Sequence, residues 1–256
     1  MSLLKIAWIN PVGTNAFDEF ILKIINSVKR ADVEPHVYHL ERGPTHLEYH
    51  FYEHLVLGEV LKLIVKLERE GFHAAVIGCF YDPGLREARE IVRMPVVAPA
   101  EASLHIAATL GHKFSIIVGR RKWIPKMESN VIIYGLNGRL ASFRIVDFTV
   151  ERMLKDPEGL KRAIAEEAEK AIKYDGAEVI VLGCTGEAGF AEELMRKLGV
   201  PVVDPVIAAW KYAEMLADLY SKLGFTHSKV YGYESPPKDE LSKFSSMYPE
   251  WRDLFK

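Results

Sequence analysis

Short apolar runs alternate with longer segments of helical periodicity along most of the chain. Residues 4–9 form a largely apolar run of strand type, and residues 16–29 then carry apolar side chains at helical spacing. The pattern predicts strands over residues 4–9, 34–40, 74–77, 96–97, 114–118, 142–146 and 179–182. It predicts helices over residues 16–29, 50–70, 85–92, 121–134 and 157–174, and another beginning near residue 101. Alternation of this kind is typical of parallel sheets covered by helices, which is an α/β fold.

Two segments of the chain have near-identical frames. An apolar run ends at Gly-Cys in each, as Ala-Val-Ile-Gly-Cys79 and Ile-Val-Leu-Gly-Cys184. A Pro-Val-Val tripeptide follows each cysteine, with its proline 16 residues after Cys79 and 17 residues after Cys184. An alanine-rich helical stretch comes next and closes on Leu-Gly in both copies. We interpret this as an internal duplication that gives two similar lobes facing each other, with one thiol from each.

The predicted architecture has two pseudo-symmetric lobes, each a parallel sheet flanked by helices. We assign residues 1–98 to an N-terminal lobe and residues 99–205 to a C-terminal lobe, with the helix at 206–223 packing near the first. Residues 224–256 are rich in Ser, Pro, Lys and Tyr and do not fit the repeat, so we expect an extended tail that wraps over the body or a partner subunit. Both cysteines follow strands, and chemistry in open α/β sheets sits at the carboxyl ends of strands.

Composition narrows the class of protein. The chain has 256 residues, of which 49% are hydrophobic, enough for a substantial core, and its net charge of -2 argues against a nucleic-acid partner. It shows no secretory leader and no apolar run long enough to cross a bilayer, so we expect a cytoplasmic protein with no membrane partner. In that reducing setting the two cysteines are expected to be reactive or buried rather than disulfide-bonded. The chain has no glutamine and five asparagines, a composition that favours a thermostable protein.

Two thiols from facing lobes suit proton transfer on opposite faces of a carbon acid. The sequence has no Cys-x-x-Cys, no phosphate loop and no Gly-x-Gly-x-x-Gly, so we predict neither metal nor cofactor. In racemisation or epimerisation a thiolate removes a proton from one face while a thiol protonates the other, and the roles exchange for the opposite enantiomer. The turns at Asp82-Pro83-Gly84 and Gly186-Glu187 precede predicted helices. We expect those helix N-termini to lower the thiol pKa values, and the backbone N–H groups of the turns to hold an enolate oxygen.

Several short motifs spread over nearly the whole chain carry a family resemblance. They are Ile9-Asn10-Pro11, Gly43-Pro44 with Glu48, Cys79-Phe80-Tyr81-Asp82-Pro83-Gly84-Leu85, Ala100-Glu101-Ala102, Leu182-Gly183-Cys184 and the tail from Thr226 to Pro237. Together they resemble the hydantoin racemase branch of the aspartate/glutamate racemase superfamily, and the motif that begins at Cys79 is quite specific. The resemblance implies cofactor-independent racemisation, two pseudo-symmetric lobes and a homo-oligomer. It also implies that Cys79 and Cys184 are the acid and base at the cleft.

The same resemblance implies a set of substrate-binding residues. They are Asn10, Gly43, Pro44, Phe80, Tyr81, Gly119, Arg120, Thr185 and Gly186. Three positions depart from the branch: Thr185-Gly186-Glu187 replaces the common Ala-Gly-Met, Gly119-Arg120-Arg121 replaces a threonine pair, and Val12-Gly13-Thr14 replaces Asn-Thr-Ser. Because these positions line the polar edge of the substrate in the family, the resemblance supports the reaction type better than the substrate. Arg120 or Arg121 could bind a carboxylate, which would favour an acidic amino acid or a carboxylated hydantoin-like compound.

Other interpretations of these residues stay open. A cysteine at a strand end is often only a small buried hydrophobe. Five histidines fall in one segment but offer no third ligand at a recognisable spacing, so we predict no metal site; they are His36, His39, His46, His50 and His54. Asp82 could be mainly an N-cap, Glu187 could serve a helix N-terminus, and the pair Arg120-Arg121 could be surface.

The sequence therefore predicts a cofactor-independent racemase of 5-substituted hydantoins, or of a related cyclic ureide such as allantoin. An amino-acid racemase of the aspartate/glutamate type is the nearest alternative. A two-lobed protein that binds a small molecule without turnover is the second.

Overall fold

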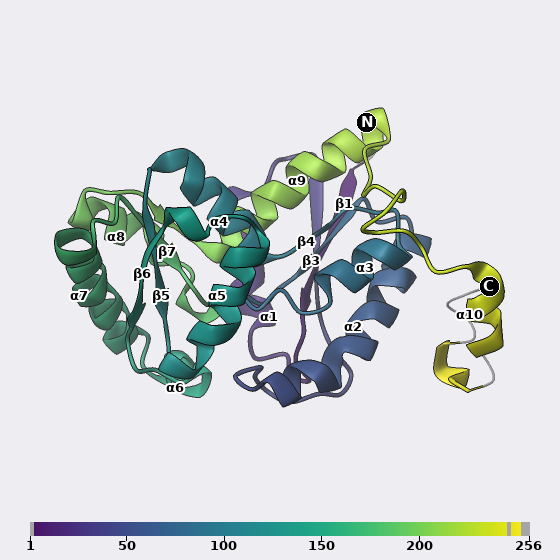
Figure 1. Cartoon of the computed structure of the whole chain (residues 1–256), viewed down its shortest axis with the longest axis horizontal. Coiled ribbons are helices and arrows are strands. Elements are labelled where there is room, and N and C mark those ends of the chain that lie inside the picture. Colours follow the sequence, from purple (N-terminus) through teal and green to yellow (C-terminus); the bar gives the residue numbers. More distant parts are fainter. Residues whose placement is uncertain (1–2, 245–246, 252–256) are drawn as a thin grey trace.

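The computed structural model describes residues 3–244 and 247–251, and it shows two α/β lobes side by side (Figure 1). Each lobe is built on a parallel four-stranded sheet. The first sheet has the order β2-β1-β3-β4, with β1 (Leu4–Asn10), β2 (Val33–His39), β3 (Ala74–Ile77) and β4 (Val96–Val97). The second has the order β6-β5-β7-β8, with β5 (Phe114–Val118), β6 (Leu140–Ile145), β7 (Val179–Leu182) and β8 (Val202–Val203). Both sheets follow one strand order, and the predicted fold of two pseudo-symmetric α/β lobes is confirmed.

Helices cover the sheets and also connect the lobes. The helices that follow strands of the first lobe are α1 (Asp18–Val28), α2 (His50–Arg69) and α3 (Leu85–Ile91). Those of the second are α5 (Ile124–Ile133), α6 (Val150–Lys155), α7 (Pro157–Asp175) and α8 (Ala191–Leu198). Two further helices pack on each other where the lobes meet: α4 (Pro99–Leu110) contacts β7 and β8, whereas α9 (Pro205–Leu223) returns to α1, β1 and β3. The chain thus crosses between the lobes twice, which ties the sheets together.

Three local features differ from the expected elements. The helix expected over residues 121–134 begins as the 3₁₀ helix η1 (Arg121–Trp123), and α5 then starts next to Pro125, which lacks an N–H and fits a first helical turn. Helix α6 has only 6 residues, too few for a periodic pattern, and the Thr149 hydroxyl caps it by accepting from the Arg152 N–H at 3.2 Å. Short 3₁₀ turns also occur at η2 (Asn137–Arg139) and η3 (Thr185–Glu187).

The tail that follows α9 lies on the body of the first lobe (Figure 1). The Lys229 ammonium donates to the Glu90 carbonyl at 2.9 Å, and the Ser235 hydroxyl donates to the same carbonyl at 2.6 Å, so both satisfy the C-terminal end of α3. The tail was predicted to be extended, but part of it is helical. It holds α10 (Lys238–Phe244), with acidic residues in its first turn and a lysine in its last, and η4 (Pro249–Trp251).

The described part of the chain contains no helix of the length and apolar character that a membrane crossing requires.

The glycine before each cysteine is required by close packing. A Cβ at Gly78 would lie 2.3 Å from Trp8 Nε1, and a Cβ at Gly183 would lie 2.3 Å from the Ile117 carbonyl oxygen. Both distances are far shorter than a van der Waals contact. The repeated Gly-Cys frame therefore has a structural cause in each lobe, independent of what the thiols do.

We expect Gly183→Ala to lower the free energy of unfolding by about 1–3 kcal/mol, because the added methyl group meets rigid backbone. Denaturant titration of the variant measures the change. Gly138→Ala is the matched control, since a Cβ at Gly138 would meet no atom within 4 Å. An unchanged unfolding midpoint for Gly183→Ala would contradict the packing explanation.

Candidate active site

The two thiols lie at equivalent positions of the two sheets. In each sheet the strand order reverses beside the first strand, so the carboxyl ends of β1 and β3, and those of β5 and β7, flank a crevice. Cys79 follows β3 by two residues and Cys184 follows β7 by two residues. Both are free thiols and both are partly buried.

A cavity lies between the lobes and has two adjoining compartments. The space open to a water-sized group is about 50 Å³ in the first and about 70 Å³ in the second. The residues that line both compartments are Leu47, Cys79, Val150, Cys184 and Thr185. The two cysteines therefore sit at the boundary that the compartments share.

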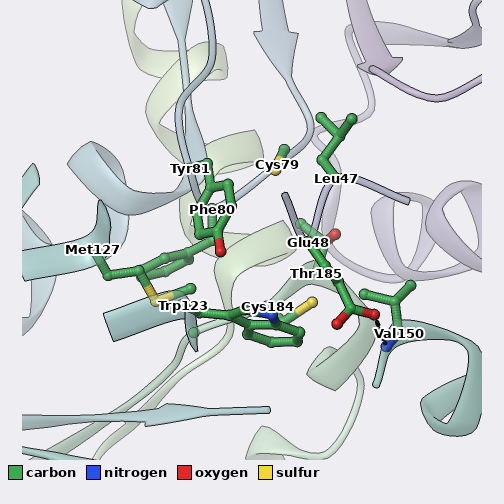
Figure 2. Close-up of a pocket in the computed structure, with 11 residues that line it drawn as sticks. Leu47, Glu48, Cys79, Phe80, Tyr81, Trp123, Met127, Val150, Cys184 and Thr185 are labelled. Carbon is green, nitrogen blue, oxygen red and sulfur yellow. Dashed lines mark hydrogen bonds between the residues drawn. The ribbon is translucent and has the colours of Figure 1, made fainter. Parts of the chain in front are cut away.

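The first compartment is mainly apolar and aromatic. Figure 2 shows Phe80, Tyr81, Trp123 and Met127 on one side of it, with Leu47, Glu48 and Val150 on the other. Phe80, Tyr81, Trp123 and Met127 are each at most 5% exposed. Rigid and buried walls of this kind suit an apolar or aromatic group.

The second compartment adds an amide and an imidazole, from Asn10 and His46. Asn10 ends β1, and its side chain is fixed on both sides: Oδ1 accepts from Trp8 Nε1 at 2.8 Å and Nδ2 donates to Asp18 Oδ1 at 2.7 Å. Backbone of Gly78 and Gly186 also lines this compartment. It therefore presents more hydrogen-bonding groups than the first compartment.

Glu48 links the two lobes at the wall of the cavity. It precedes α2 in the first lobe, and its side chain is only 4% exposed. Its Oε1 accepts from the Val150 N–H at 3.0 Å and its Oε2 accepts from Arg120 Nη1 at 2.8 Å, both in the second lobe (Figure 2 shows the bond to Val150). The carboxylate thus helps to set the spacing between the lobes and hence between the thiols.

A backbone N–H group acts on each thiol. The Gly186 N–H donates to Cys184 Sγ at 3.4 Å, and the Tyr81 N–H acts on Cys79 in the same way. The expected lowering of the thiol pKa values is nevertheless wrong. Burial outweighs these donors: it raises the pKa of Cys79 to about 12 and that of Cys184 well above its ordinary value.

The structure brings five of the predicted substrate-binding residues to the cavity. They are Asn10, Phe80, Tyr81, Thr185 and Gly186. Pro44 instead accepts from the Gly13 N–H at 3.0 Å, and Gly43 packs on Gly13, so both support the loop after β1. Gly119 has no side chain, so the Trp123 ring can pack close to the Gly119 backbone. Arg120 contacts the cavity wall indirectly, by donating to Glu48. Substrate binding by Gly43, Pro44, Gly119 and Arg120 stays a prediction.

Asp82 is an N-cap, but for a helix distant in sequence. Its carboxylate accepts from the N–H groups of Ala100 and Glu101 at 2.9 Å each, at the start of α4, and from the Tyr134 hydroxyl at 2.6 Å. Gly84, not Asp82, stands at the N-cap position of α3. Burial raises the pKa of Asp82 to about 7.

The histidine segment is dispersed in the fold. His46 lines the second compartment, His39 pairs with Asp18 at 2.7 Å, and His50 stacks on Tyr81. Over residues 3–244 and 247–251, no three His, Cys, Asp or Glu side chains come together as a possible metal site.

Sequence reasoning missed four residues of the first compartment, namely Leu47, Trp123, Met127 and Val150, and also Phe17 of the second. Trp123 and Met127 belong to a predicted helix, where apolar residues have the same pattern whether they face a core or a cavity. Leu47 and Val150 lie outside the predicted helices, so no local pattern marks them either. The sequence marks Glu48 only as part of a motif.

Two facing α/β lobes thus each bring one thiol to a shared cavity. The chain belongs to the Asp/Glu/Hydantoin racemase family, which matches it over residues 6–213. It is 37% identical to a hydantoin racemase of Pseudomonas sp. (strain NS671), over 93% of this chain and 94% of that protein. It is 34% identical to a hydantoin racemase of Paenarthrobacter aurescens, over 93% and 99%. Among solved structures it is similar to an allantoin racemase from Klebsiella pneumoniae, with 33% identity, a TM-score of 0.86 and coverage of 95% and 98%.

Proposed function

We propose that the protein is a cofactor-independent racemase of 5-substituted hydantoins, with Cys79 and Cys184 as the acid and base. The observation that carries the proposal is the pair of free thiols at the boundary of the two compartments, one from each lobe. The relatives named as hydantoin and allantoin racemases support the substrate class, because both substrates are cyclic ureides.

The proposed reaction needs one thiolate and one thiol. The thiolate takes the proton from C5, which lies next to a ring carbonyl, and the electron pair of the C–H bond passes into an enolate. The opposite thiol then gives its proton to the other face of C5, and the product leaves with inverted configuration. For the opposite enantiomer the two cysteines exchange roles.

The two compartments suggest how the substrate lies. The ring of the ureide fits the second compartment, where Asn10, His46 and Thr185 offer hydrogen-bonding groups. The 5-substituent then enters the first compartment, among Phe80 and Trp123. The charged residue that lines the first compartment, Glu48, is paired with Arg120, so the wall offers no cation for a substrate carboxylate. We therefore propose apolar or aromatic 5-substituents rather than the polar ureido group of allantoin.

A panel of enantiopure compounds tests the proposal: 5-benzylhydantoin, 5-isobutylhydantoin, allantoin, aspartate and glutamate, each followed by loss of optical rotation. We expect racemisation of the first two, with a kcat/KM at least about tenfold above that for allantoin, because burying a benzyl or isobutyl group contributes about 1.5–3 kcal/mol. Faster turnover of allantoin would contradict the assignment of the apolar compartment. Racemisation of aspartate or glutamate alone, or binding without turnover, would contradict the proposed function.

The raised thiol pKa values predict how the rate depends on pH. Because the thiols stay protonated at neutral pH, the thiolate is a minor species that grows as pH rises. We expect kcat/KM to rise from neutral into alkaline pH, about tenfold per pH unit while the enzyme stays well below the thiol pKa. The kcat/KM profile against pH is measured for two hydantoins whose rings ionise at different pH. A change that is common to both profiles comes from the enzyme, whereas one that differs between them comes from the substrate. A flat profile would show that a thiolate is already present at neutral pH.

We further propose a homo-oligomer in the cytoplasm. Free thiols suit a reducing compartment. Phe51 and Leu55 lie one turn apart on α2 and are 66% and 54% exposed, which supports a contact between subunits. Light scattering of the purified protein measures the oligomeric state.

A further inference from the structure

Asp82 and Glu187 occupy corresponding positions in the two lobes. Each stands three residues after its cysteine, and each backbone N–H donates to the carbonyl oxygen of that cysteine at 2.9 Å. The two turns therefore share this backbone hydrogen bond and a carboxyl-bearing residue at the same sequence position, although Asp82 has left-handed backbone with φ 51° whereas Glu187 ends the 3₁₀ helix η3.

The surroundings of these two carboxyl groups are opposite. Asp82 accepts three hydrogen bonds, from two backbone N–H groups and the Tyr134 hydroxyl. Glu187 is 0% exposed, and neither of its carboxyl oxygens has a hydrogen-bond partner within the described residues. The backbone N–H groups of Gly183 and Cys184 act to lower the pKa of Glu187, but neither meets hydrogen-bond geometry with its carboxyl oxygens.

The sequence explains the difference between the lobes. The residue before the proline that opens α4 is Ala98, whereas the residue before the proline that opens α9 is Asp204. Asp204 caps α9 itself, since its carboxylate accepts from the N–H groups of Val206 at 2.8 Å and Ile207 at 3.1 Å. Helix α4 has no such residue and takes Asp82 as its cap, so only Glu187 is left without a structural partner.

An unpaired carboxylate in the protein interior is costly, which favours the protonated carboxyl group at Glu187. Burial raises the pKa of Glu187 well above its ordinary value. The Glu187 carboxyl group and the Cys184 thiol are coupled by like-charge repulsion. A negative charge on Glu187 raises the pKa of the Cys184 thiol, and only burial raises it more.

The other charged groups around this turn are engaged elsewhere. Helix α6 packs against η3, but its Glu151 and Lys155 pair with each other at 2.6 Å on the surface, and its Arg152 lies over the Phe148 ring at 3.9 Å. Asp204 also accepts from the Gly189 N–H at 2.6 Å. Glu48 and Cys79 face Cys184 from the first lobe.

We propose that Glu187 is a positioning residue that shares one ionisation with Cys184, so that the carboxyl group keeps its proton whenever Cys184 is a thiolate. At rest the Cys184 thiol and the Glu187 carboxyl group are both protonated. The first ionisation removes one proton, either from the thiol or from the carboxyl group. Cys79 faces a weaker competitor: Asp82 also raises the pKa of the Cys79 thiol, but less than Glu53 does, Lys126 opposes both, and the Asp82 carboxylate has three hydrogen-bond donors where Glu187 has none. The two thiols are therefore inequivalent although both follow the same Gly-Cys frame.

Alkylation of single-thiol variants tests the inference. The rate at which iodoacetamide modifies Cys184 is measured against pH in Cys79→Ser, with and without Glu187→Gln, by intact mass. Glutamine cannot ionise and does not compete with Cys184 for the negative charge. In the pH range where Glu187 would lose its proton, we therefore expect the Cys184 profile to move to lower pH, with the rate at a fixed pH rising about tenfold for each pH unit that the profile moves. In Cys184→Ser the same substitution should leave the Cys79 profile unchanged. Glu187→Met is the second variant and should move the Cys184 profile in the same direction.

A structural role for Glu187 alone predicts no movement of the Cys184 profile in either variant, and that result, or an equal movement at Cys79, would overturn the inference. Infrared spectroscopy at neutral pH gives an independent readout. The carbonyl band of a protonated carboxyl group should be lost in Glu187→Gln, and an unchanged spectrum would also overturn the inference. The inference rests on the proposed role of Cys184, but alkylation requires no turnover. A protein that fails to racemise hydantoins can therefore still show the altered profile.

Discussion

Cys79→Ser and Cys184→Ser are each expected to lower the kcat for hydantoin racemisation by about a thousandfold, within the usual range for loss of a general acid or base. A serine hydroxyl is a far weaker acid than a thiol, so the variant can neither form the required anion nor protonate the enolate efficiently. Each loss should be nearly complete because inversion needs both faces of C5. The two variants should therefore be equally inactive.

The measurement is the initial rate of change in optical rotation, with each enantiomer as the starting substrate. Serine differs from cysteine by one atom, and we expect the denaturation midpoints to stay near that of the unsubstituted protein. The chain has only 2 cysteines, so each variant retains one thiol that mass spectrometry can count. Activity within tenfold of the unsubstituted protein, in either variant, would exclude that cysteine as acid or base.

Glu48→Ala is expected to have the second largest effect. It leaves the partly buried Val150 N–H without its carboxylate partner and removes the charge that faces Arg120, which should lower the free energy of unfolding by about 2–4 kcal/mol. Because the carboxylate joins the lobes beside the cavity, we also expect kcat/KM to fall by roughly a hundredfold, as a displacement of about 1 Å between reacting groups can produce.

Glu48→Gln separates the two contributions, since the amide oxygen can still accept from Val150 while the charge is lost. Arg120→Ala and the double variant Glu48→Ala/Arg120→Ala complete a double-mutant cycle. If the pair acts as a unit, the double variant should be no less active than Glu48→Ala alone. A kcat/KM within threefold of normal in Glu48→Ala would show that this link does not set the spacing of the thiols.

The duplication explains why so much of the fold was predictable. Fully buried parallel strands have continuous apolar runs, as in Val179–Leu182, and the repeated Gly-Cys frame located two equivalent strand ends. The strand order of each sheet then places both cysteines at a crevice. Short elements escaped prediction, because α6 depends on the Thr149 cap and on tertiary contacts rather than on a periodic pattern.

The chemistry of the site was harder to predict than its location. Local sequence indicated backbone donors after each cysteine, and these are present at Tyr81 and Gly186. It could not give the degree of burial, which reverses the direction of the pKa change at both thiols. Trp123 and Met127 come from a helical segment whose apolar residues resemble core, and only the approach of the other lobe turns them into a cavity wall.

Enantiomer-specific exchange in deuterium oxide tests the two-face mechanism most directly. In Cys79→Ser only Cys184 can remove the C5 proton, and in Cys184→Ser only Cys79 can do so. The proposed mechanism predicts that each variant exchanges C5 hydrogen for deuterium in one enantiomer of 5-benzylhydantoin without inversion, and that the two variants act on opposite enantiomers. Exchange of the same enantiomer by both variants would place both thiols on one face of the substrate and contradict the mechanism.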